Sequence, residues 1–164
     1  MRVLRQRLPL LLRSRVLARI ARCPPDFVIG GIERPYLERW FVIPRNRVFN
    51  VYLHHFLRSD DDRALHDHPW ASLSIMLDGE YTEHTIAQGG IHRRRVVRAG
   101  DVRFRASGRL AHRIELHAGP CWTLFITGPR YRDWGFHCPD RGWVDWREFT
   151  SPTDSGSVGR GCAP

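Results

Sequence analysis

Short extended segments that recur at regular intervals constrain the fold of this chain more than any other feature. Runs rich in β-branched and aromatic residues alternate with turns rich in glycine. The runs cover residues 48–57, 72–77, 81–86, 91–97, 102–105, 111–116, 121–127, 132–136 and 143–149. No convincing helix pattern lies between them, so the sequence argues against a parallel α/β fold. We therefore predict an all-β sandwich or barrel.

The composition divides the chain into three parts. Residues 1–25 form a basic N-terminal extension, with seven arginines and no acidic residue in the first 22 positions. Its longest apolar run, residues 8–12, is far shorter than the ~20 residues that span a bilayer. Residues 26–150 are predicted to form one β-barrel domain, and residues 151–164 a flexible tail because Ser, Gly, Pro and Thr dominate there.

The net charge of +9 raises the question of a nucleic-acid partner. The 26 basic residues are all arginine, which indicates a bias of the whole sequence rather than a local binding device. We do not expect nucleic acid to be a partner. The four cysteines form no C-x-x-C pair, so a reduced, cytoplasmic setting is predicted. Exposed sheet edges make a homodimer plausible.

Two histidines separated by one residue, His66 and His68, are the first candidate for chemistry. In an extended segment they project to the same face, because strand side chains alternate with a period of two. His112 follows a glycine-rich turn and opens a later strand, as the third ligand from a return strand of a barrel would. Three imidazoles with open positions suit one divalent transition metal, with Fe(II) first and Zn²⁺, Mn²⁺ or Ni²⁺ as alternatives.

These positions resemble the two sequence motifs of the cupin superfamily. In the first motif His66, His68 and Gly79 are in register, but Ser72 stands where the metal-binding Glu is expected. In the second motif Gly100, Gly108 and His112 match, with one residue inserted before the histidine; Ala106 takes the proline position and Leu116 that of the asparagine. The phrases LRSDDDRALHDHPW, GEYTEH, AHRIEL, WTLFITGPR and WGFHCP are similar to an uncharacterised cupin-domain family of bacteria and phages.

The resemblance implies a cupin-type double-stranded β-helix, also called an RmlC-like jelly-roll barrel, and a metal site of three histidines. Without the carboxylate ligand the metal keeps its full charge, which favours an anionic substrate. Arg103, Arg105 or Arg113 could clamp a carboxylate. His54 and Ser72 are further candidates for contact with the site. Glu83 and Glu115 could support a ligand, although pairing with arginine is the simpler expectation.

Thiol dioxygenases of the cupin superfamily resemble this three-histidine arrangement. We therefore expect a small-molecule metalloenzyme of the non-haem iron dioxygenase type. The alternative is a non-catalytic cupin that binds a small ligand or nucleic acid. A metal-free isomerase-like site, with histidine as the base, is a third reading.

Overall fold

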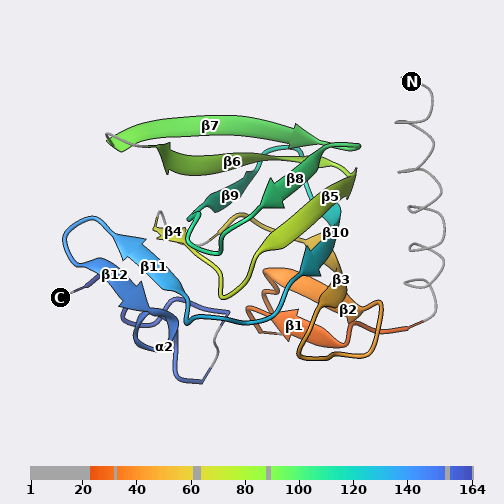
Figure 1. Ribbon diagram of the computed structural model, residues 1–164, viewed down its shortest axis with the longest axis horizontal. Coiled ribbons are helices and arrows are strands. Elements are labelled where there is room, and N and C mark those ends of the chain that lie inside the picture. The colour runs from red at the N-terminus through yellow and green to blue at the C-terminus, as the bar shows by residue number, and fades with distance from the viewer. Residues whose placement is uncertain (1–22, 32, 61–63, 88–89, 154–155, 164) are drawn as a thin grey trace.

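The computed structural model describes residues 23–31, 33–60, 64–87, 90–153 and 156–163. It confirms the all-β prediction, and the strands are arranged in two layers (Figure 1). The first layer is a six-stranded antiparallel sheet in the order β1-β2-β3-β10-β5-β8. Its strands are β1 (Phe27–Ile29), β2 (Leu37–Phe41), β3 (Asn50–Phe56), β10 (Cys121–Thr127), β5 (Ser72–Asp78) and β8 (Val102–Arg105).

The second layer consists of two three-stranded sheets. One has the order β7-β6-β9 and the other β12-β11-β4. Their strands are β4 (Leu65–His66), β6 (Glu80–Ala87), β7 (Ile91–Arg98), β9 (Arg113–Leu116), β11 (Gly135–Cys138) and β12 (Gly142–Asp145). An isolated antiparallel bridge between His66 and His112 joins the two sheets into one layer. Two of the three predicted metal ligands therefore lie at the seam of this layer.

The main hydrophobic core lies between the two layers. Leu37, Phe56, Met76 and Cys121 come from the six-stranded sheet and are buried against Tyr81, Val97 and Ile114 of the β7-β6-β9 sheet. Inward and outward side chains alternate along these strands, as the period of two requires. Glycine with positive φ forms the tight turn between β5 and β6 at Gly79. A smaller cluster of Ala64, Cys138, Val144 and Phe149 packs under the β12-β11-β4 sheet.

The last predicted run, residues 143–149, is extended only in its first half. The chain leaves β12 and forms a short helix, α2 (Trp146–Phe149). The carboxylate of Asp145 accepts a hydrogen bond from the backbone N–H of Arg147 and caps this helix. The extended prediction is therefore wrong for residues 146–149, because a local capping interaction decides the backbone there.

The cysteines are not all reduced in the structure. Cys138 and Cys162 form a disulfide bond across 24 positions of the sequence, whereas Cys23 and Cys121 remain thiols. The composition of residues 151–164 favours a flexible tail. In the structure the described residues of this segment also pair with the domain through a bridge between Thr150 and Val158 and two hydrogen bonds to the carbonyl of Phe149. Within the described ranges, no helix is long and apolar enough to cross a membrane. The basic extension predicted at residues 1–25 lies almost entirely outside those ranges.

Candidate metal centre

His66 and His68 point to the same side because the backbone between them is extended and because the buried side chain of Asp67 holds the segment in place. Between them Asp67 points to the opposite side and is 1% exposed. Its carboxylate accepts hydrogen bonds from the backbone N–H of Gly135 (2.9 Å) and the indole N–H of Trp143 (3.1 Å) and pairs with Arg132 (2.8 Å). Burial alone would raise the pKa of Asp67, but hydrogen bonds with His137, Arg132 and the backbone of Gly135, and the charge of Arg132, outweigh it and hold the pKa below its usual value. Asp67 therefore fixes the His-x-His segment to β11 and β12.

The third histidine is brought in by backbone pairing. His66 and His112 exchange two N–H to carbonyl hydrogen bonds, both 2.9 Å long. The N–H of His68 donates to the carbonyl oxygen of Gly108 (2.8 Å). A Cβ atom at Gly108 would lie 2.1 Å from the carbonyl oxygen of His68, so this position has no room for a side chain. Glycine is thus required at position 108 of the second motif, because the backbones of Gly108 and His68 approach each other closely.

The three imidazoles converge. One ring nitrogen from each of His66, His68 and His112 lies within 4.8 Å of the others. The Nε2 atoms of His68 and His112 are 2.8 Å apart. Two nitrogens bound to one cation at about 2.1 Å each, and about 90° apart, would be separated by roughly 3.0 Å. The donor set and its spacing therefore fit a transition-metal ion.

Burial keeps these imidazoles in the form that binds metals. We call His54, His66, His68 and His112 the cavity imidazoles, because all four line one cavity. Burial is the main cause that lowers the pKa of each of them. For His112 the charge of Arg105 lowers the pKa further, and for His66 the carboxylate of Asp60 partly opposes the effect. Neutral imidazole is the ligand form of histidine.

Two carboxylates support the cluster from behind. Oδ2 of Asp60 lies 3.7 Å from Nδ1 of His66 and accepts a hydrogen bond from the backbone N–H of Ile114 (2.6 Å). Oε1 of Glu83 lies 3.2 Å from Nδ1 of His112. A carboxylate that accepts the Nδ1–H hydrogen orients the ring and leaves Nε2 for the metal. Oε1 of Glu83 makes no hydrogen bond to a described residue, so Glu83 lies beside His112 as a charge and is not one of the three converging ligands.

Glu83 is also the centre of a buried ion cluster. It is 1% exposed and pairs with Arg105 and with Arg103, whose Nη2 is 2.8 Å from Oε2. Nη2 of Arg105 lies 3.1 Å from Nδ1 of His112 as well. A guanidinium can only donate, so in this contact Nδ1 of His112 is the acceptor. Burial lowers the pKa of Arg105, and the carboxylate of Glu83 supplies its counter-charge.

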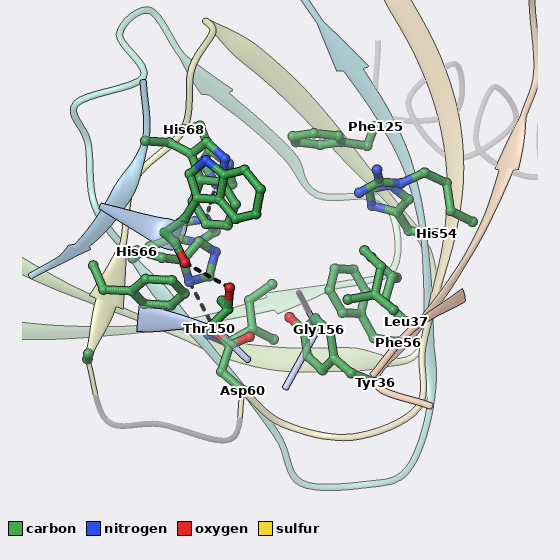
Figure 2. A pocket seen from close by; sticks show the side chains of 18 of the residues that line it. Tyr36, Leu37, His54, Phe56, Asp60, His66, His68, Phe125, Thr150 and Gly156 are labelled. Carbon is green, nitrogen blue, oxygen red and sulfur yellow. Dashed lines mark hydrogen bonds and ion pairs between the residues drawn. The ribbon is translucent and has the colours of Figure 1, made fainter. Parts of the chain in front are cut away.

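A cavity of about 370 Å³ opens beside the three histidines (Figure 2). Its walls are largely apolar and include Phe56, Phe125 and Phe136. His54 faces it from β3, across from His66 and His68 in this view. Polar lining groups include Arg39, Asp60 and Arg105. A cavity of this size and lining accommodates a small organic molecule.

Five of the predicted site residues do not line the cavity: Glu83 and Arg103 belong to the buried ion cluster, and the other three lie elsewhere. Ser72 is buried on β5 and does not line the cavity, and its hydroxyl makes no hydrogen bond to a described residue. Arg113 and Glu115 are on β9, with 3.8 Å between their charged groups, and Glu115 accepts a hydrogen bond from His84 (2.6 Å). Neither lines the cavity. The simpler expectation of arginine pairing describes both Glu83 and Glu115.

Sequence reasoning missed two residues of the site. Asp60 was not among the candidate residues, but its carboxylate contacts the backbone of β9 and approaches His66. Arg39 precedes the first predicted extended run, residues 48–57. In β2 it shares a face with the core residue Leu37 and reaches the cavity. The position of Arg39 two residues after the apolar Leu37 could have indicated that both share one face of a strand. No comparable pattern in the sequence points to Asp60.

Comparison with known proteins identifies the fold. No family model and no curated protein matches the sequence. Among solved structures, the Fe(II) form of HppE matches 63% of this chain and 56% of its own, with a TM-score of 0.51 and 13% identity. Oxalate decarboxylase of Bacillus subtilis, described for its Mn(II) centres, matches 72% of this chain at a TM-score of 0.50 and 18% identity. This chain spans 31% of that decarboxylase. These are cupin-fold proteins, so the predicted jelly-roll fold is confirmed.

Proposed function

We propose that this protein is a metal-dependent cupin that acts on a small anionic molecule, with chemistry of the non-haem iron dioxygenase type. The observation that carries the proposal is the convergence of His66, His68 and His112 on one wall of a largely apolar cavity. The comparable proteins include Fe(II) and Mn(II) forms. Fe(II) is our first choice of metal because three neutral ligands leave positions open for a substrate and O₂.

The residues of this chain have separable parts in the proposed site. The three histidines would hold the ion, which when bound would supply Lewis acidity and redox chemistry. Asp60 and Glu83 place carboxylate charge near Nδ1 of His66 and of His112. The phenylalanines give the cavity an apolar wall, and Arg105, which is paired with Glu83, lies at its edge. Within the described part of the chain no carboxylate is placed among the three ligands, so the charge of the ion would favour an anionic substrate.

Metal content tests the proposed centre directly. Protein purified without a histidine tag should contain close to one transition-metal ion per chain. His112→Ala should lose most of it, since two imidazoles bind far more weakly than three. His92→Ala is the matched control, because His92 is exposed and lies outside the cluster. Equal metal content in the wild type and the His112 variant would refute the proposal.

Oxygen consumption then separates an enzyme from a binding protein. The Fe(II)-loaded protein is screened with thiols and small carboxylates under air. Substrate-dependent O₂ uptake that is absent in His112→Ala would support the dioxygenase. Metal binding without uptake across the screen would favour the non-catalytic cupin. The metal-free isomerase draws support from the contact of Asp60 with His66, which could serve as a carboxylate–histidine base; it requires a protein active after chelation.

A further inference from the structure

Arg39 is a cation of the cavity wall with no carboxylate partner among the described residues. Its Nε–H donates to Nε2 of His54 (2.9 Å), and its guanidinium lies 4.8 Å from the ring centre of Tyr52. Burial lowers the pKa of Arg39 to about 10, and Arg45 contributes in the same direction. Arg39 is half-buried, and a partly desolvated guanidinium without a counter-ion is costly, so this position favours an anion.

His54 adds a second donor beside this guanidinium. Because its Nε2 accepts from Arg39, the hydrogen of the neutral ring is on Nδ1. His54 is 4% exposed and lines the cavity. The guanidinium and the imidazole N–H are therefore neighbouring donors on one wall.

The other charges of the cavity already have protein partners. Arg105 is paired with Glu83. Asp60 accepts from the backbone of Ile114 and lies beside His66. Arg39 is thus the cavity cation whose charge no described carboxylate offsets.

Phe125 provides an apolar surface between this wall and the three histidines. Its ring centre is 5.1 Å from that of His54 and 6.2 Å from that of His68. Figure 2 shows Phe125 and His54 on one side of the cavity and His66 and His68 on the other. A planar apolar group laid along Phe125 would reach both ends.

We propose that Arg39 and His54 form a carboxylate-binding subsite, and that the natural ligand is a small carboxylic acid with an apolar or aromatic body. The inference rests on the proposed function in one respect: the far end of the ligand is taken to face the three histidines. The carboxylate end does not need the metal. A single guanidinium and one N–H donor match the two oxygens of a carboxylate.

Benzoate and benzamide are the probes, because they share shape and differ in charge. Isothermal titration of the purified protein should show benzoate binding in the millimolar range or tighter, and at least about tenfold tighter than benzamide. Arg39→Gln should weaken benzoate by at least about tenfold and leave benzamide unchanged. Arg39→Lys, which keeps the charge, should recover part of the loss. Arg98→Gln is the control, since Arg98 is 66% exposed and paired with Glu80.

A further variant separates the subsite from the metal centre. His112→Ala should lose metal yet retain benzoate binding, because the carboxylate is held at the opposite wall. Benzoate binding that is lost in His112→Ala and kept in Arg39→Gln would place the carboxylate at the metal and overturn the subsite. Equal binding of benzoate and benzamide, or no benzoate binding to the wild type, would overturn it as well. Melting curves of each variant confirm that the binding-defective proteins are folded.

Discussion

Glu83→Gln should destabilise the protein far more than an ordinary change of charge on a β-strand. The substitution preserves shape but removes the only carboxylate that faces Arg105 and Arg103 in the ion cluster of the described structure. Glu83 is 1% exposed and the side chain of Arg105 6% exposed, so water cannot replace the lost counter-charge. An amide N–H₂ would also face guanidinium donors where an oxygen now accepts.

The expected magnitude follows from the burial of both partners. Removal of one member of a buried ion pair costs about 3–5 kcal/mol, because the other charge is left uncompensated. For a chain of this size that loss lowers the melting temperature by about 6–20 °C. Equilibrium unfolding in urea, followed by tryptophan fluorescence with a chelator present, measures the free energy directly.

The same substitution at Glu80 is the matched control. Glu80 lies on the same strand and also pairs with an arginine, Arg98, but the two side chains are 34% and 66% exposed. Glu80→Gln should therefore cost no more than about 1 kcal/mol. In a double-mutant cycle, Arg105→Met should cost clearly less in the Glu83→Gln background than in the wild type. A Glu83→Gln protein within about 1 kcal/mol of the wild type, or an additive cycle, would refute the reasoning.

Three further predictions concern pH, the disulfide and the turn beside the metal ligands. Burial lowers the pKa of the four cavity imidazoles, so below about pH 6.5 the unfolded chain binds more protons than the folded one. The metal-free protein should therefore be most stable above that pH, and its free energy of unfolding should fall by up to about 1.4 kcal/mol per pH unit for each imidazole as the pH drops toward the pKa values of the folded state. His54→Gln should reduce the slope of the urea-derived free energy of unfolding against pH by the contribution of one imidazole. Denatured but unreduced protein should react with a thiol reagent at two cysteines, and reduced protein at four; four reactive thiols before reduction would contradict the disulfide. The double variant Cys138→Ser, Cys162→Ser should lose about 3.5 kcal/mol of the free energy of unfolding, because the unfolded chain is no longer closed into a loop. Gly108→Ala should lower metal affinity by about tenfold or more, because its Cβ would meet the carbonyl oxygen of a ligand residue at 2.1 Å, whereas Gly128→Ala, where the nearest atom is at 3.7 Å, should bind metal normally.

The site is more predictable at its ligands than at the residues that support them. The spacing of His66 and His68 and the turn before His112 are local patterns, and the structure brings these side chains together. Glu83 belongs to a different strand, and nothing near it in the sequence indicates that its carboxylate would reach the far nitrogen of His112. The cytoplasmic setting, the homodimer and the absence of a nucleic-acid partner stay predictions.

The sequence by itself determined the layered β architecture and the three imidazoles, because alternation and glycine turns act within a few residues of one another. Only the tertiary structure decided which charges meet. Asp60 is held near His66 by its hydrogen bond to the backbone of β9, and Arg39 faces the cavity because β2 pairs with β3. Cys138 forms a disulfide with Cys162, which lies beyond α2 in the sequence. Each contact depends on the order in which strands pair and on which faces become buried. Those choices are made by the packing of the whole domain, so no local pattern in the chain records them.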